Sequence, residues 1–186
     1  TSLLRRPGIQ LTGDITPSYS ALSLGTVQEI LANFEKRKIT VRPVFLMRDP
    51  IERIISSQRM QLRKQNKLNH QTEVDALRQL CMEQPERVAL RSDYGHTLMT
   101  LNQVFHPSEC FIDLYERLFT PASWQRLCDV LNVPYAEPDW EQQVNVSRTD
   151  TSVPDEVLAE LGAWQAPTFA AVRQSMGHLD LAQLWP

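Results

Sequence analysis

Residues suited to binding a phosphate follow directly after the apolar run Val44–Met47. That run predicts a strand buried on both faces of a parallel sheet. Asp49 and Pro50 then form the N-cap and the first residue of a predicted helix. Arg48 therefore stands between a strand end and a helix start, where open α/β sheets bind ligands and backbone N–H groups attract anions. With Ser56 two helical turns further on, the stretch predicts a phosphate site. The alternative is a capped turn that binds no ligand.

A carboxylate that could accept a proton lies earlier, in the segment Gly13–Tyr19, which contains Gly-Asp-Ile-Thr-Pro-Ser-Tyr. A hydroxyl or amine attacks an electrophile more readily as it loses its proton, and a positioned carboxylate such as Asp14 can take that proton. The alternative is a turn in which Asp14 caps local backbone groups. The segment is thus a candidate for general-base chemistry.

Hydrophobic periodicity predicts strands and helices in alternation, which is typical of an α/β protein with a parallel sheet and helices on both faces. Strands are expected at 10–15, 44–47 and 110–115. The apolar face of the helix that begins at Pro50 is expected to pack on this sheet. Other helices are expected at about 27–38, from Thr72 onward, and at 92–105, 121–131, 154–161 and 168–176. Three strands are few for such a sheet, so we expect further strands outside this chain.

The stretch Arg-Asp-Pro-x-x-Arg-x-x-Ser after an apolar strand resembles the 3′-phosphate-binding segment of sulfotransferases that use 3′-phosphoadenosine 5′-phosphosulfate. The resemblance implies that Arg48 and Ser56 hold the 3′-phosphate. The segment that contains Asp14 is similar to the Gly-Glu-Lys-Ser/Thr-Pro-x-Tyr segment of the carbohydrate type, whose acidic residue is the catalytic base. This chain departs from it in two ways, because aspartate is shorter than glutamate and Ile15 replaces a common lysine.

The same resemblance extends from about Gly13 to Trp185 and implies further site residues. Asn145-Val146-Ser147-Arg148 is similar to the late loop that closes over the nucleotide, so Arg148 is expected to add a phosphate contact. Thr1 and Ser2 match the end of the loop that holds the 5′-phosphosulfate. Acceptor contacts are expected from three side chains, those of Tyr19, Tyr94 and His96.

The lysine-bearing loop that cradles the phosphosulfate has no match here, because no Gly-x-x-x-x-Gly-Lys pattern exists in the sequence. In the family its N–H groups and lysine stabilise the leaving phosphate. The chain also starts at Thr1 without a methionine. We therefore expect residues 1–186 to form a single sulfotransferase domain that is incomplete at its N-terminus. The expected fold is the three-layer, P-loop-containing nucleotide hydrolase-like fold.

Composition limits the partners that this chain can have. A net charge of -3 argues against a nucleic-acid binder, and no apolar run is long enough for a transmembrane segment. The three cysteines contain no CxxC pair, which indicates free thiols, a reducing compartment such as the cytoplasm and no zinc site. No metal cofactor is expected.

The function that the resemblance implies is transfer of a sulfuryl group from the phosphosulfate donor to a hydroxyl or amine. The acceptor is a small molecule or a carbohydrate, and the second product is 3′-phosphoadenosine 5′-phosphate. Two alternatives stay open. One is a P-loop kinase that acts on a nucleotide or small molecule, and the other is a nucleotide-binding module without catalysis.

Overall fold

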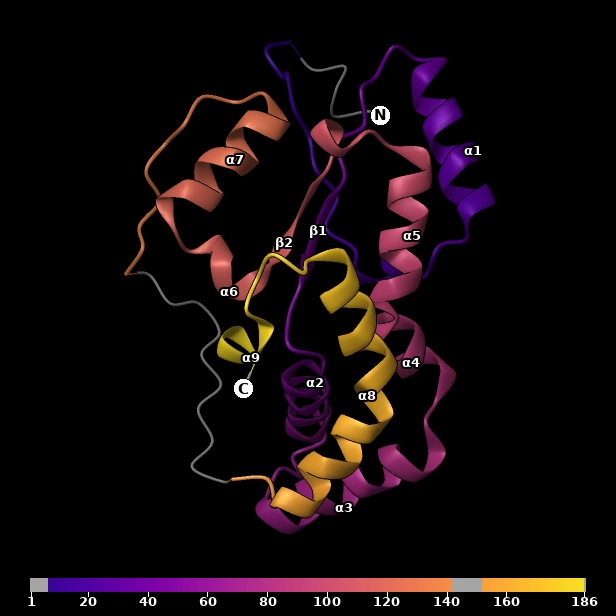
Figure 1. Ribbon diagram of the computed structural model, residues 1–186, viewed down its shortest axis with the longest axis vertical. Coiled ribbons are helices and arrows are strands. Elements are labelled where there is room, and N and C mark those ends of the chain that lie inside the picture. The colour runs from indigo at the N-terminus through magenta and orange to yellow at the C-terminus, as the bar shows by residue number, and fades with distance from the viewer. Residues whose placement is uncertain (1–6, 142–151, 186) are drawn as a thin grey trace.

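The computed structural model describes residues 7–141 and 152–185. A two-stranded parallel sheet lies at the centre, with helices on either side (Figure 1). The described elements are, in chain order, η2 (Pro17–Ala21), α1 (Leu24–Glu35), β1 (Val44–Met47), α2 (Pro50–Lys64), α3 (His70–Glu83), α4 (Glu86–Ser92), α5 (Tyr94–Val104), η3 (Pro107–Glu109), β2 (Phe111–Leu114), α6 (Tyr115–Leu118), α7 (Pro121–Leu131), α8 (Asp155–Ser175) and α9 (Leu181–Leu184). The α/β class with a parallel pair is confirmed at this level.

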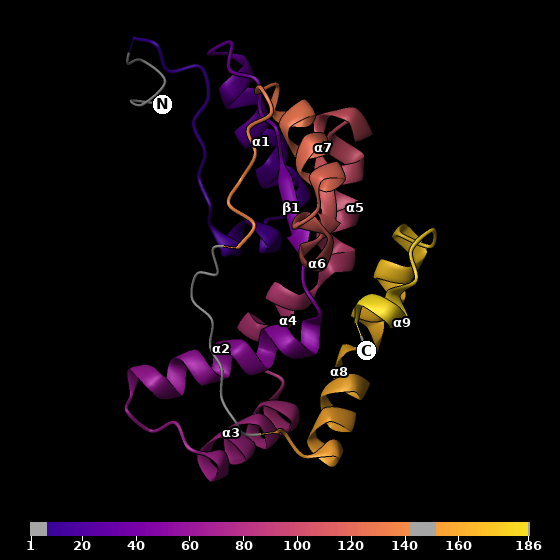
Figure 2. The same ribbon diagram turned by 90° about the vertical axis from the view of Figure 1, so that its left-hand side faces the viewer.

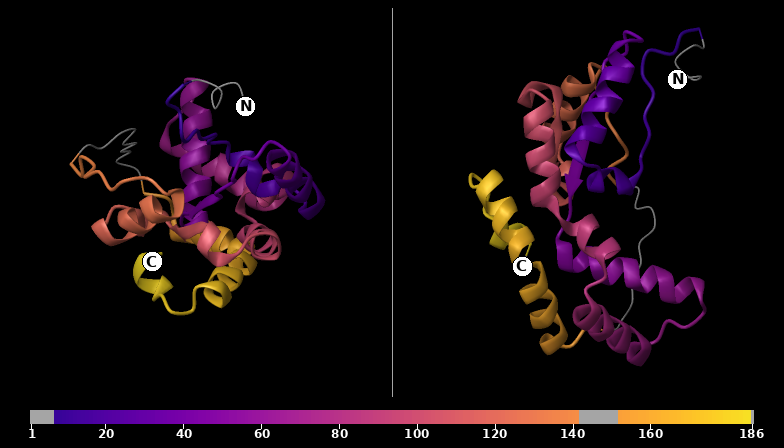
Figure 3. Two further views of the ribbon diagram at one scale, coloured as in Figure 1. Left: turned by 90° about the horizontal axis from the view of Figure 1, so that it is seen from above. Right: turned by 90° about the vertical axis from the view of Figure 1, so that its right-hand side faces the viewer.

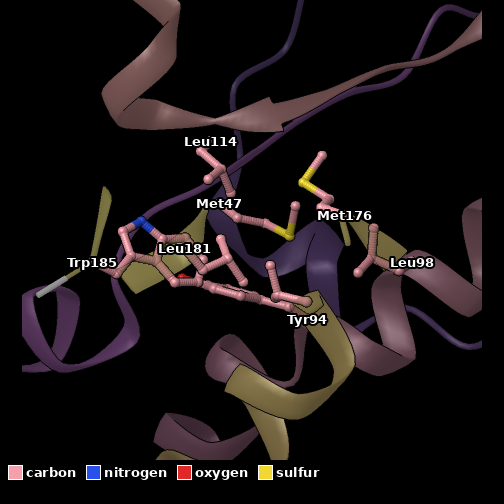
Figure 4. Packing of buried hydrophobic residues seen from close by; sticks show 8 residues of the cluster. Met47, Tyr94, Leu98, Leu114, Met176, Leu181 and Trp185 are labelled. Carbon is pink, nitrogen blue, oxygen red and sulfur yellow. The ribbon is translucent and has the colours of Figure 1, made fainter. Parts of the chain in front are cut away.

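The pairing register divides the sheet into two faces. Phe45 lies opposite Ile112, and Met47 lies opposite Leu114. These four side chains belong to a core cluster with residues of α5, α8 and α9, several of which Figure 4 shows around Met47. Helices α5, α8 and α9 thus cover one face of the sheet. Helices were expected on both faces, and α7 packs on the other one.

Contacts of β2 with α7 define that other face. The guanidinium of Arg126 lies 4.8 Å from the ring centre of Phe111 and also pairs with the buried carboxylate of Asp113. Ser123 donates a second hydrogen bond to Asp113, at 3.1 Å. Viewed from above, α7 and α1 lie on opposite sides of the molecule (Figure 3). The expectation of a strand buried on both faces is wrong for Val44, which is 44% exposed.

A second core lies below the sheet, where α2, α3 and α8 meet (Figure 2). It contains Ile54 and Ile55 of α2, Val74 and Leu77 of α3, and Val157 and Leu161 of α8. The apolar face of α2 was expected to pack on the sheet, and that expectation is wrong. The turn at Asp49 directs α2 away from the strands, so its isoleucines meet two helices that are distant in the sequence.

Other local expectations are corrected by packing and capping. The expected strand at 10–15 is wrong, since these residues form neither helix nor strand and are all exposed. Helix α1 begins at Leu24, because Ser23 accepts a hydrogen bond from the Thr26 amide at 3.2 Å. The two helices expected in the tail are one helix, α8, with a proline inside it.

Candidate functional site

The turn after β1 is held by a well-formed helix cap. The Asp49 carboxylate accepts hydrogen bonds from the backbone amides of Ile51 at 2.7 Å and Glu52 at 3.1 Å. Pro50 occupies the first helical position, as expected. A cap satisfies amides that a helix N-terminus otherwise leaves without a partner. The sequence therefore determines where α2 begins and, with it, the position of Arg48.

Arg48 stands at the carboxyl end of β1 with 40% of its side chain exposed. Its guanidinium lies 3.5 Å from the Glu52 carboxylate, one helical turn further on. A pair this exposed is weak, about 0.3–0.5 kcal/mol. An incoming anion can therefore displace Glu52 from Arg48 at small cost.

The backbone of this turn is held from the core side. The Tyr94 hydroxyl donates to the Arg48 carbonyl at 2.9 Å, and the Tyr94 ring is only 3% exposed. Burial raises the pKa of Tyr94, so the hydroxyl stays protonated as a donor. Tyr94 was expected to contact the acceptor. Its ring lies in the core instead, so its position is that of a residue that places Arg48.

Glu116 links the turn to the end of the described chain. One oxygen of its carboxylate accepts from the Asp49 amide at 3.4 Å, and the other accepts from the Trp185 indole at 2.9 Å. Asp49 is 6% exposed, and burial raises its pKa, with Glu52 and Glu116 adding repulsion while its two amide bonds act in the opposite direction. The carboxylates of Asp49, Glu52 and Glu116 thus all lie at the turn that carries Arg48.

A second arginine lies close to this turn and was not expected as a site residue. Arg53 donates to the Ser92 hydroxyl and, at 3.5 Å, to the Val88 carbonyl, which ties α2 to α4. Its buried Nε atom has no hydrogen-bond partner in the described chain. Burial lowers the pKa of Arg53. The sequence feature that could have indicated Arg53 is its spacing of five residues from Arg48, which places it one helical turn after the Asp49 cap.

The segment that contains Asp14 continues into η2, which packs against α4 and α5. The Thr97 hydroxyl donates to the Ser20 carbonyl at 2.8 Å, and the His96 ring nitrogen Nε2 lies 2.9 Å from the Leu22 carbonyl. His96 was expected at an acceptor site, whereas here its Nε2 is engaged in fastening this segment to α5.

Asp14 itself is fully exposed and forms a local network. It accepts hydrogen bonds from the Tyr19 hydroxyl at 2.7 Å and from the Thr16 hydroxyl at 2.8 Å. The bond from Tyr19, and then that from Thr16, hold the pKa of Asp14 below its usual value. A lower pKa makes a carboxylate a weaker base. The turn alternative had Asp14 capping backbone groups, whereas its two partners here are side-chain hydroxyls, which places a carboxylate and a phenol side by side.

Four further residues were expected at the nucleotide site, and the structure describes one of them. Ser56 lies on α2, partly buried, eight residues after Arg48. Thr1, Ser2 and Arg148 lie outside the described residues. Between Pro7 and Glu141 and between Ser152 and Trp185, no group of three or more His, Cys, Asp or Glu side chains could hold a metal ion.

Comparisons with known proteins add no family to this geometry. No family model matches the chain, and neither a curated protein nor a solved structure matches it. The helices of the described residues include none with the length and apolar character needed to cross a bilayer. The three cysteines are free thiols, and burial raises the pKa of Cys110 to about 11.

Proposed function

We propose that this chain binds 3′-phosphoadenosine 5′-phosphosulfate, and its product adenosine 3′,5′-bisphosphate (3′-phosphoadenosine 5′-phosphate), at the carboxyl end of β1. We also propose that the chain is part of a sulfotransferase that uses this donor. The proposal includes a P-loop-like three-layer fold, in which β1 and β2 are two strands of a larger parallel sheet. It also includes a cytoplasmic location and a small-molecule or carbohydrate acceptor.

The observation that carries the proposal is the placement of Arg48. Its partly exposed guanidinium adjoins the N-terminus of a fifteen-residue helix. The helix dipole and the guanidinium both favour an anion at this point. The buried Tyr94 hydroxyl donates to the Arg48 carbonyl, so the backbone that carries the Arg48 side chain is fixed in place. These features support binding of the 3′-phosphate at Arg48.

Sulfuryl transfer would use Asp14 as the base. The acceptor oxygen or nitrogen forms a bond to sulfur while the bond from sulfur to the 5′-phosphate oxygen breaks. The acceptor proton passes to Asp14, and the bisphosphate leaves with the electron pair of the broken bond. If Asp14 has this role, Asp14→Asn lowers kcat about 10²- to 10⁴-fold and leaves donor binding nearly unchanged.

One observation favours a second candidate, a module that binds the nucleotide without transfer. The hydrogen bonds from Tyr19 and Thr16 depress the pKa of Asp14 and occupy both of its oxygens. A carboxylate in this state is a weak base until the hydroxyl or amine of the substrate that receives the sulfuryl group displaces Tyr19 or Thr16. Turnover of the phosphosulfate by the protein, lost in Asp14→Asn, supports the enzyme; nucleotide binding without turnover supports the module.

Titration calorimetry tests the site itself. Adenosine 3′,5′-bisphosphate and adenosine 5′-phosphate are titrated into the wild type, Arg48→Ala and Ser56→Ala. A charge-assisted contact is worth about 1.5–3 kcal/mol and a neutral one about 0.5–1.5. Arg48→Ala should therefore weaken bisphosphate binding about 10- to 150-fold, and Ser56→Ala about 2- to 13-fold. Both losses should shrink with the 5′-phosphate, which lacks the 3′-phosphate.

Two controls accompany this titration. Arg37→Ala removes a guanidinium that donates a hydrogen bond to the Asn33 carbonyl at the end of α1, and it should leave both affinities unchanged. ATP with magnesium is titrated as the ligand of the kinase alternative. Equal losses for the two adenosine ligands would mean that the 3′-phosphate is bound elsewhere, and tighter binding of magnesium ATP would favour the kinase.

A further inference from the structure

A surface cleft of about 380 Å³ lies between the second half of α1, the loop that leads into β1 and the end of α5. Figure 1 shows α1 beside α5, and the two helices are in contact. The apolar side chains that line the cleft are those of Leu31, Ile39, Val41, Val104 and Phe105. A cleft of this volume with a largely apolar lining is typical of small-molecule sites.

The cleft is separate from the nucleotide site proposed above. Val41, which lines it, precedes β1, whereas Arg48 follows β1 at the other end of the strand. Glu109 also lines the cleft and precedes β2 in the same way. The cleft therefore lies at the amino end of both strands, and an inference about it does not depend on the proposed function.

The turn that ends α1 fixes one side of the cleft. The Lys38 amide donates to the Glu35 carbonyl at 2.8 Å, and the Ile39 amide donates to the Phe34 carbonyl at 3.1 Å. This pair of bonds is the Schellman pattern, in which a residue just after the helix takes left-handed backbone angles. Lys38 does so, with φ of 56°, at a position where glycine is favoured. The turn thus holds Lys38 and Ile39 in place at the cleft.

The charged residues that line the cleft differ in whether they have partners. Glu109 has them, because its carboxylate accepts from Arg42 at 3.2 Å and from the His106 amide at 3.1 Å. Glu35 and Lys38 are exposed, and neither side chain forms an ion pair within the described chain. One carboxylate and one ammonium group are therefore available to a ligand in an otherwise largely apolar cleft.

We infer that this cleft binds a free α-amino acid with an apolar side chain, such as leucine. The ammonium group of the ligand pairs with Glu35, its carboxylate pairs with Lys38, and its side chain packs on the apolar lining. A ligand with only one of the two charges gains only one of the two ion pairs. A zwitterion with an apolar side chain is the class that uses all three features of the cleft.

Four probes that differ in one group each test the inference. Leucine, alanine, 4-methylpentanoate and 3-methylbutylamine are titrated into the protein without nucleotide, followed by the methyl NMR signals of Ile39 and Val104. The pentanoate lacks the ammonium group of leucine and the amine lacks its carboxylate. Each should bind about two- to fivefold more weakly than leucine, as expected for the loss of one exposed ion pair. Leucine should bind about 7- to 50-fold more tightly than alanine, the range for half and complete burial of three further carbon groups.

Two results of this titration would overturn the inference. One is that leucine does not bind, or that either singly charged probe binds as tightly as leucine. The other is that the same methyl signals shift when the protein is concentrated without any probe, since a second copy of the chain would then occupy the cleft.

Variants then locate the binding. Glycine favours left-handed backbone angles, so Lys38→Gly removes the ammonium group and keeps the turn, which a thermal melt checks. It should weaken leucine binding about two- to fivefold and leave that of 3-methylbutylamine unchanged. Glu35→Gln should weaken leucine binding by a similar factor and leave that of 4-methylpentanoate unchanged.

Matched controls remove the same charges outside the cleft. Lys36→Gln and Glu29→Gln change residues near or on α1 that do not line it, and both should leave leucine binding unchanged. An unchanged affinity for leucine in Lys38→Gly or in Glu35→Gln would overturn the inference, because the ligand would then not pair with that residue.

Discussion

Asp49 offers the sharpest test of how the turn before α2 is built. Its carboxylate caps two amides, at 2.7 and 3.1 Å, and is 6% exposed. Losing a cap costs about 0.5–2 kcal/mol. Because both bonds are partly buried and the carboxylate accepts two of them, we place Asp49→Ala in the upper half of that range, about 1–2 kcal/mol. In a chain of this size, that lowers the melting temperature by about 2–8 °C.

Asp49→Asn should behave in the opposite way at neutral pH. Asparagine keeps an oxygen that can accept both amide bonds, and it removes a buried charge that Glu52 and Glu116 repel. We therefore expect the asparagine variant to be at least as stable as the wild type at pH 7. We thus expect stability at pH 7 to fall in the order Asp49→Asn, wild type, Asp49→Ala. This order distinguishes the effect of the capping hydrogen bonds from the effect of the charge.

The pH dependence follows from the raised pKa of Asp49. The folded value lies above the ordinary value of 3.8, so the unfolded chain loses its proton first as the pH rises. Stability from the protonated form is fully present below 3.8 and is lost as the pH rises through the folded pKa. The advantage of Asp49→Asn over the wild type should therefore grow with pH in this window and then level off.

Urea unfolding of the wild type and both variants, at several pH values, measures these differences. Comparing variants at each pH cancels the titration of all other groups that the substitution does not affect. An asparagine variant about 1 kcal/mol less stable than the wild type at pH 7 would refute the reasoning, because it would show that the charge of Asp49 stabilises the turn. An alanine variant as stable as the wild type would refute the capping role.

Two further predictions concern the proposed site. Glu52→Gln should raise bisphosphate affinity about twofold, since it frees Arg48 from an exposed pair worth about 0.3–0.5 kcal/mol; calorimetry would contradict this with a weaker or unchanged affinity, and Glu29→Gln is the control. Tyr19→Phe should raise the pKa of Asp14 towards its usual value, because it removes the strongest of the two hydrogen bonds that lower it; a carboxyl NMR titration with no upward shift would show that Tyr19 does not hold Asp14.

Local residue chemistry predicted the elements around the expected site closely. The apolar run Val44–Met47 is a strand, and Asp49 with Pro50 begins the helix that follows. Thr120 with Pro121 begins α7 in the same way. These features depend on propensity and on hydrogen bonds between residues near each other in the chain. Sequence alone therefore determined where Arg48 lies relative to a strand and a helix.

Tertiary packing decided which side chains are free to act. Tyr94 and His96 were expected to contact the substrate that receives the sulfuryl group. The Tyr94 ring is buried in the core, and the His96 ring lies at hydrogen-bond distance from the Leu22 carbonyl. The sequence also gave no sign that Trp164 and Gln165 of α8 would line a cleft with Asp93, about seventy residues earlier. Burial, hydrogen-bond partners and juxtaposed helices depend on contacts between distant segments, whereas periodicity and capping reflect neighbours in the chain.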